Sequence, residues 1–144
     1  MRGVEVQMSA TQLATYIFIL HQSCCTHHGG LVKAGQHHPL SDKDVQRLGS
    51  TYHAICNLFR DTPITDERSY LEDVPNIRGY IARIRTAIAH HIDDQDIRFY
   101  TPQDTSDKSR YYIAIDPTKI TLRLSSGEIP FMDYPLWKTL ASKH

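Results

Sequence analysis

The first strongly patterned stretch of the chain is SATQLATYIFILHQSC, residues 9–24. It opens with Ser9 and Gln12 at the spacing of a capping box, in which side chains satisfy free backbone amides at the start of a helix. The apolar residues that recur behind it at helical spacing are Leu13, Tyr16, Ile17, Leu20 and Cys24. This pattern predicts a helix of about 20 residues with one apolar stripe, and Gly29 and Gly30 are expected to stop it.

The middle of this predicted helix is more apolar than one stripe requires. Tyr16, Ile17 and Phe18 follow one another and therefore face different directions around the helix axis. We expect the additional apolar surface to be covered, either by a second copy of the chain or by the β-rich residues nearer the C-terminus.

Two further helices are predicted downstream. A second capping box, Ser41–Asp44, begins the first of them. Its apolar stripe is Val45, Leu48, Tyr52, Ile55, Cys56 and Phe59. The other helix is expected to open near Asp73, with Pro75 in its first turn, where the missing amide proton costs no hydrogen bond. Its core stripe is Ile77, Tyr80, Ile81, Ile84 and Ile88.

The pattern changes after Asp96. Residues 111–115 and 120–124 are β-rich runs, and residues 116–119 between them predict the turn of a hairpin. A further short strand is expected at 129–131, followed by one or two C-terminal helical turns.

These elements predict a mainly α fold, a small helical bundle with a C-terminal β-hairpin appendix. A chain of 144 residues fits one domain, 1–144, which we divide into a helical core at 1–95 and a β-rich extension at 96–144. The aromatic pairs Phe99-Tyr100 and Tyr111-Tyr112 could stack on bases, but we expect them to fill the packing between hairpin and helices. Trp137 is expected to anchor the C-terminal segment.

Composition narrows the class of protein. Sixteen Lys and Arg balance sixteen Asp and Glu, so no overall basic field draws the chain to nucleic acid. Three cysteines without framework spacing favour a reducing compartment. The apolar run Leu13–Leu20 is too short to span a bilayer and lacks the pattern of a signal peptide. We therefore expect a cytoplasmic protein with no membrane partner.

The third predicted helix concentrates positive charge in a chain whose net charge is zero. Residues 74–92 contain no carboxylate, and their basic residues are Arg78, Arg83, Arg85, His90 and His91. One interpretation is a solvated basic face without a ligand. The other is a phosphate-binding strip, because the planar fork of arginine matches the oxygens of a phosphate.

Within this strip, Arg85-Thr86-Ala87-Ile88-Ala89-His90 forms an Arg-x4-His element. Here the sequence resembles the HEPN superfamily (higher eukaryotes and prokaryotes nucleotide-binding), whose nuclease members carry Arg-x4-6-His. In that family a polar residue often follows the arginine, and Ile-Ala often precedes the histidine. Thr86 stands where asparagine is commoner. The resemblance covers residues 9–95 as a helical domain and leaves the β-rich segment outside.

The resemblance implies metal-independent cleavage of RNA, without a cofactor, to 2′,3′-cyclic phosphate and 5′-hydroxyl ends. It assigns His90 as general acid and base, Arg85 as the group that stabilises the scissile phosphate, and Thr86 as a polar helper. The candidates for substrate binding are Arg78, Arg83 and His91. Such nucleases act as homodimers with the motifs facing at the interface, and bacterial members are commonly toxins or phage-defence effectors, which implies an antitoxin or defence partner.

Helical geometry separates the two main candidates. Residues five apart lie about 140° apart around a helix, so Arg85 and His90 do not share a face, whereas Arg83 and His90 differ by only about 20°. Either the helix loosens near His90, or the site is assembled from two subunits that each add an Arg–His set. Asp93 and Asp94 follow the helix and are either solvated or orient an imidazolium.

Two alternatives to the nuclease stand beside it. One is a non-catalytic helical module that binds RNA, a nucleotide or a partner, since superfamily members without activity exist. The other is a zinc-stabilised regulator, because residues of zinc-ligand type cluster at Cys24, Cys25, His27, His28, His37 and His38. Their adjacent pairs do not match the usual zinc spacing, and the stripe position of Cys24 favours a buried core thiol. We therefore assign no metal ligands.

Overall fold

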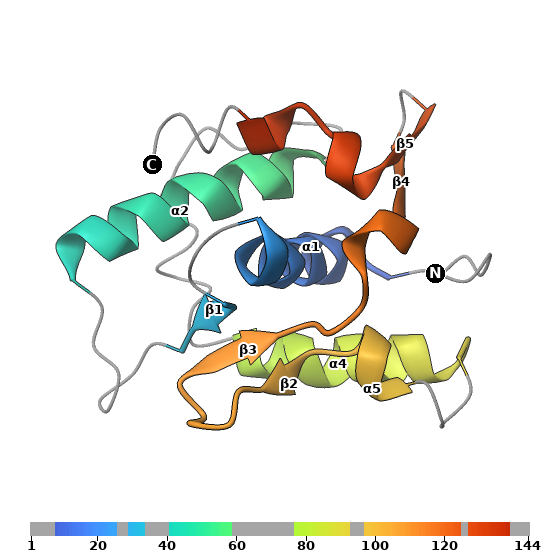
Figure 1. Ribbon diagram of the computed structural model, residues 1–144, viewed down its shortest axis with the longest axis horizontal. Coiled ribbons are helices and arrows are strands. Elements are labelled where there is room, and N and C mark those ends of the chain that lie inside the picture. The colour runs from blue at the N-terminus through green and yellow to red at the C-terminus, as the bar shows by residue number, and fades with distance from the viewer. Residues whose placement is uncertain are drawn as a thin grey trace.

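The computed structural model describes residues 8–25, 29–33, 41–58, 77–92, 97–124 and 127–138. Its helices are α1 (Ala10–Cys24), α2 (Asp42–Leu58), α4 (Ile77–Ala89) and α5 (Ile97–Tyr100), with 3-10 turns η2 (Pro117–Lys119) and η3 (Phe131–Asp133). Its strands are β1 (Leu31–Val32), β2 (Gln103–Asp104), β3 (Arg110–Tyr112), β4 (Thr121–Leu124) and β5 (Gly127–Pro130). The described chain is mostly helical with two small antiparallel sheets, which is compatible with the predicted mainly α class (Figure 1).

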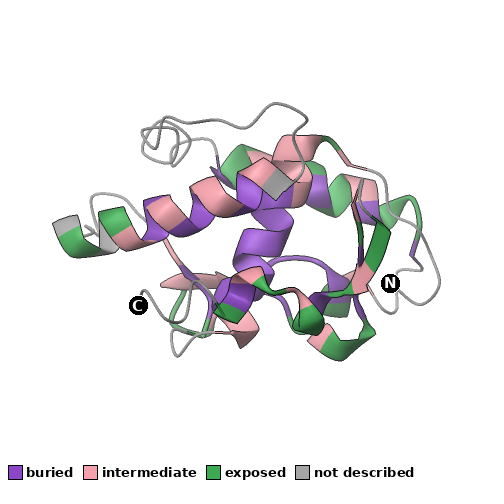
Figure 2. Cartoon of the chain, turned by 90° about the horizontal axis from the view of Figure 1, so that it is seen from above, coloured by how far each residue is buried: buried purple, intermediate pink, exposed green. Residues whose placement is uncertain are grey.

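Helix α1 lies in the middle of the molecule, with α2 along one side and α4 along the other (Figure 1). Every residue from Ala14 to Gln22 is buried, and Figure 2 shows the helix buried over most of its length. The prediction that α1 buries only one stripe of its surface is therefore wrong, because this part of the helix is buried on every side. Because the middle of the helix is apolar on every side, burying one stripe would have left apolar surface in water.

The start of α1 confirms the Ser9 half of the capping box. The side chain of Ser9 accepts a hydrogen bond from the amide of Gln12 at 3.3 Å. The helix ends at Cys24, where the Cys25 amide donates to the carbonyl of His21 at 2.9 Å, so it is shorter than predicted.

The predicted glycine stop has another role. The amide of Gly30 donates to the Gln22 carbonyl at 3.0 Å, which turns the chain back along α1. Gly30 has a φ of 140°, and a Cβ at this position would collide with the Tyr111 carbonyl. Glycine therefore lets Leu31 enter β1 beside β3.

Helices α2 and α4 follow their predicted patterns. Helix α2 begins at Asp42, directly after Ser41. The buried apolar residues of the two helices are Leu48, Tyr52, Ile55, Cys56, Ile77, Ile81, Ile84 and Ile88. These positions confirm the core stripes, except that Tyr80 is only half-buried. The side chain of Val45, residue Phe59 and the predicted helix start at 73–75 lie outside the described residues.

The predicted hairpin between residues 111–115 and 120–124 is wrong, because these two runs pair with other strands. Strand β3 lies between β1 and β2 with Leu31 opposite Tyr111, and β4 pairs with β5. Between β3 and β4, Asp116 Oδ1 accepts from the Thr118 amide at 3.0 Å and Pro117 opens η2. This local turn continues the chain in a new direction instead of folding β4 back on β3. The short strand expected near the C-terminus is present as β5.

The segment expected to be an appendix instead covers α1. The Tyr16 hydroxyl donates to the Tyr100 carbonyl at 2.7 Å, and the Ile113 amide donates to Ser23 Oγ at 3.2 Å. Burial, and to a smaller extent the neighbouring Tyr100, raises the pKa of Tyr16, so its hydroxyl stays a donor. The apolar surface of α1 was expected to be covered by a second copy of the chain or by the C-terminal segment. The structure shows the C-terminal segment in this role.

Trp137 anchors the end of this segment, as predicted. Its buried indole donates to the Phe131 carbonyl, and the ring centroids of Trp137 and His21 are 4.9 Å apart. A helix buried all round has to satisfy its polar side chains, and His21 Nδ1 lies 3.1 Å from the Gln22 side-chain amide.

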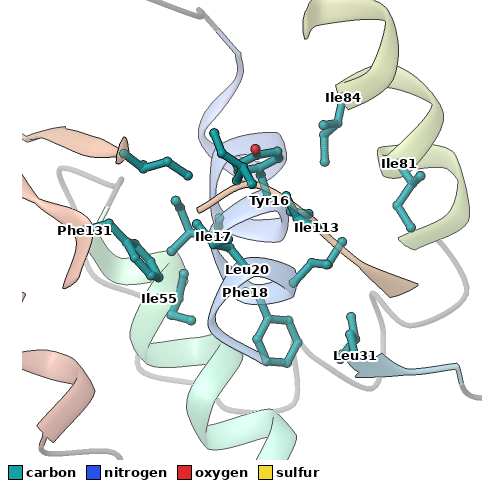
Figure 3. Packing of buried hydrophobic residues seen from close by; sticks show 14 of the residues in the cluster. Tyr16, Ile17, Phe18, Leu20, Leu31, Ile55, Ile81, Ile84, Ile113 and Phe131 are labelled. Carbon is teal, nitrogen blue, oxygen red and sulfur yellow. The ribbon is translucent and has the colours of Figure 1, made fainter. Parts of the chain in front are cut away.

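Side chains from the surrounding elements converge on α1 (Figure 3). Ile55 reaches it from α2, Ile84 from α4 and Leu31 from β1. The Phe18 and Tyr52 rings lie 5.2 Å apart between centroids. One continuous core therefore joins the helices to the C-terminal segment.

Within the described ranges, no helix is both long enough and apolar enough to cross a membrane.

Tyr16→Phe is expected to lower the free energy of unfolding by about 1–3 kcal/mol, because it leaves the buried Tyr100 carbonyl without its donor. Tyr112→Phe is the matched control, since Tyr112 is half-buried and its hydroxyl has no hydrogen bond within the described residues; a change within about 0.5 kcal/mol is expected. Urea unfolding measures both. Equal effects of the two variants would contradict the role assigned to the Tyr16 hydrogen bond.

Candidate functional site

Helix α4 has one buried face and one basic face. Four buried isoleucines form the face of α4 that packs on α1, because residues three and four apart share a side of a helix; they are Ile77, Ile81, Ile84 and Ile88. The residues of the predicted site are all exposed: Arg78, Arg83, Arg85 and Thr86 lie on the rest of the helix, and His90 and His91 follow its end. The hydrophobic stripe therefore turns the acid-free basic face toward solvent.

Arg85 is held in place by the chain before β2. Its Nε and Nη2 both donate to the Pro102 carbonyl, at 3.0 and 2.7 Å. These two bonds use one edge of the guanidinium, and Nη1 has no hydrogen bond to any described residue. An arginine anchored by one edge loses less side-chain entropy when the other edge binds a phosphate.

A carboxylate lies near this arginine but has its own partner. Asp104 pairs with Lys33, with 2.7 Å between Nζ and Oδ1. The hydrogen bond from Lys33 lowers the pKa of the Asp104 carboxyl, and Arg85 adds a smaller attraction. Asp104 is therefore ionised at neutral pH, and its negative charge is paired with the positive charge of Lys33.

His90 and His91 lie in the turn after α4. The His91 amide donates to the Ile88 carbonyl at 2.9 Å, and the Ile92 amide donates to the same oxygen at 3.1 Å. Both imidazoles are exposed and form no hydrogen bond within the described part of the chain. Asp93 and Asp94, considered as partners for an imidazolium, lie outside the described residues.

Thr86 and the two remaining arginines differ in what they contact. The Thr86 hydroxyl donates to the Ala82 carbonyl of the preceding turn at 3.1 Å, so its proton is already used and only its lone pairs are free. Arg78 and Arg83 are exposed and form no ion pair or hydrogen bond with any described residue.

Arg85 and His90 are not brought together within the described chain. Helix α4 is regular as far as Ala89, and Arg85 is held at Pro102 while His90 lies in the following turn. No hydrogen bond joins the two side chains. A site assembled from two subunits stays a prediction.

Two residues of α5 extend the basic face and were not singled out as site residues. Arg98 is exposed, and the Phe99 side chain is 57% exposed, although Phe99 was expected to pack internally. Its neighbour Tyr100 is buried, which confirms the packing role for that ring. Helix α5 lies against α4 (Figure 1). Four residues carry too little periodicity to show from sequence which aromatic ring faces solvent.

A second cluster of reactive groups lies at the end of α1. Cys24 and Cys25 are both half-buried free thiols, and their Sγ atoms are 3.5 Å apart. Their mutual hydrogen bond raises the pKa of Cys24 and lowers that of Cys25, and burial raises the pKa of Cys24 further. The histidines grouped with them, at 27, 28, 37 and 38, lie outside the described residues. Among the residues that are described, no three potential metal ligands gather.

Comparison with known proteins gives no relative: no family model, no curated protein and no solved structure matches the chain. The functional interpretation therefore depends on the residues of this chain.

Arg85→Ala is expected to lower the free energy of unfolding by about 1 kcal/mol, because it removes two partly buried, charge-assisted hydrogen bonds that tie α4 to the strand segment. Arg83→Ala removes the same charge from the same helix without losing a described contact, so we expect a change within about 0.5 kcal/mol. Thermal and urea unfolding measure the difference. If both variants lose the same stability, the Pro102 contact has no anchoring role.

Proposed function

We propose that the chain is a metal-independent endoribonuclease whose basic face on α4 binds RNA. One observation carries the proposal. A chain of zero net charge presents one helix whose exposed charged side chains are all basic, and Arg78 and Arg83 have no acidic partner among the described residues. Phosphate is the ligand that matches exposed arginines for which the described residues offer no carboxylate.

The RNA is proposed to lie along α4 and α5. Arg78, Arg83 and Arg98 would contact phosphates, and Phe99 offers an exposed ring on which an unpaired base can stack. Because such stacking needs a base that is not already paired, single-stranded RNA is the preferred form.

Cleavage is assigned to His90 and Arg85. An exposed imidazole can remove the proton of a ribose 2′-hydroxyl and later protonate the leaving 5′-oxygen. The free edge of Arg85 would stabilise charge on the scissile phosphate, with Thr86 as an acceptor beside it. DNA lacks the 2′-hydroxyl and is expected to stay intact.

The separation of Arg85 from His90 supports a dimeric site. In this proposal two HEPN-like helical bundles place their α4 helices face to face, so that the arginine of one subunit acts beside the histidine of its partner. The resemblance of Arg85-x4-His90 to HEPN nucleases supports the same arrangement, and a role as a toxin or defence effector with a matching antitoxin.

The alternative is an RNA-binding module without catalysis. It is favoured by the two hydrogen bonds that fix Arg85 at Pro102 without a contact to His90. The two proposals share the binding face and differ only in turnover.

Incubation of the purified protein with single-stranded RNA in excess chelator tests the nuclease. We expect products with 2′,3′-cyclic phosphate ends and no cleavage of DNA of the same sequence. The rate of cleavage by His90→Ala is expected to be lower than that of wild type by a factor of at least about 100. Arg85→Lys keeps the charge but loses the fork, and it is expected to slow cleavage with little change in binding. RNA bound by wild type without any cleavage would select the alternative, and cleavage undiminished in His90→Ala would reject the assigned site.

Binding has its own matched control. Arg78→Ala and Arg83→Ala are each expected to weaken RNA binding and to reduce the slope of log affinity against log salt by about 0.7. Arg123→Ala removes the same charge from β4, where Arg123 pairs with Glu128 at 2.8 Å, and is expected to leave the slope unchanged. Fluorescence anisotropy over a salt series measures all three. Equal losses in the three variants would indicate a general charge effect and contradict a defined face.

A further inference from the structure

The two thiols at the end of α1 lie close together, in a geometry that suits binding of one shared ion better than formation of a disulfide. Cys24 is the last residue of the helix and Cys25 is its C-cap, so the backbone fixes both sulfurs on the same short segment. Their Sγ atoms lie 3.5 Å apart, and both residues are only half-buried. The third cysteine, Cys56, is buried in α2 and takes no part.

A disulfide between these neighbours is disfavoured. Adjacent Cα atoms across a trans peptide are about 3.8 Å apart, which is less than the roughly 4.4–6.8 Å that disulfides span. The sulfurs would also have to close to about 2.05 Å, and the ring would twist the peptide bond between the two cysteines. That peptide carries the Cys25 amide, which donates to the His21 carbonyl at 2.9 Å and ends the helix.

A bridging ion fits the same sulfurs without this distortion. Bonds from an ion to thiolates are about 2.3 Å long for zinc. Two such bonds to sulfurs 3.5 Å apart enclose an angle of about 100°, which is near the tetrahedral value. An ion that prefers two thiolates in a straight line would need a separation of about 4.6 Å and fits poorly.

We propose that Cys24 and Cys25 form a chelating dithiolate site for a soft ion that binds sulfur at a bent angle, represented by Zn²⁺ and trivalent arsenic. Zn²⁺ would replace the two thiol protons, which leave to solvent. An organic arsenic(III) oxide would form two As–S bonds, and its oxygen would leave as water with both protons, so that no atom is oxidised or reduced. The Cys24 thiol, which donates to the Leu20 carbonyl, gives up that bond.

An ion bound at this site would stabilise the end of α1, where the chain of β1 and of β3 is attached to the helix. Immediately before the cysteines, Gln22 accepts from the Gly30 amide and Ser23 accepts from the Ile113 amide. An ion held by the next two residues would fix the end of α1 where β1 and β3 attach, so bound ion should raise the melting temperature. The site lies at the end of α1 and is independent of the ribonuclease proposal, whose residues lie on α4, in the turn after it and on α5.

The test is titration of the reduced, folded protein with phenylarsine oxide, followed by intact-mass measurement. We expect one phenylarsenic group on wild type and on the control Cys56→Ser, and none on Cys24→Ser or Cys25→Ser. Circular dichroism confirms that each variant is folded, and Cys24→Ala and Cys25→Ala replace any serine variant that is not. Lack of uptake by folded wild type, or uptake retained by the double variant Cys24→Ser/Cys25→Ser, would overturn the proposal.

Zn²⁺ provides the second probe. Competition with a chromophoric chelator is expected to show affinity at least about 100-fold weaker in each single variant than in wild type, because one thiolate binds without the effective concentration of the other. Added Zn²⁺ should raise the melting temperature of wild type and of Cys56→Ser, but not that of the double variant. Equal Zn²⁺ affinity in wild type and the double variant would exclude zinc from the site.

Discussion

Burial of α1 on every side, from Ala14 to Gln22, is the constraint on which the rest of the structure depends. A helix that is apolar on every side has no face for solvent, so each flank needs its own cover. Helices α2 and α4 cover two flanks, and the three-stranded sheet and the C-terminal segment cover the others. Strands of two or three residues are not stable alone. They form here because α1 offers them an apolar surface and two anchoring points, at Ser23 and at the carbonyl of Gln22.

The same constraint determines what α4 presents to solvent. Its isoleucine face is taken by α1, so every basic residue of the helix falls on the outer surface. The segment that covers α1 then returns past α4, where the Pro102 carbonyl receives both hydrogen bonds of Arg85. Core packing and the position of a proposed site residue are thus coupled through one stretch of backbone. A change that loosens the C-terminal cover is expected to release this arginine as well.

Both proposed sites lie where regular helix ends or faces water. His90 lies just beyond the last turn of α4, and the two thiols lie at the end of α1. Helix ends leave carbonyls without helical partners and let neighbouring side chains take directions that the helical interior does not allow. Cys24 and Cys25 come into contact for this reason, since consecutive residues inside a helix point about 100° apart.

The sequence by itself determined the features that depend on neighbours along the chain. The Ser9 cap, the buried stripes of α2 and α4 and the acid-free basic face follow from residue spacing, because helical hydrogen bonds and side-chain faces repeat within a few residues. Only the tertiary structure decided the pairing of Leu31 with Tyr111, the anchoring of Arg85 and the exposure of Phe99. Each of these joins segments that are distant in sequence, or depends on which neighbour covers a side chain, and a local pattern carries no information about such partners.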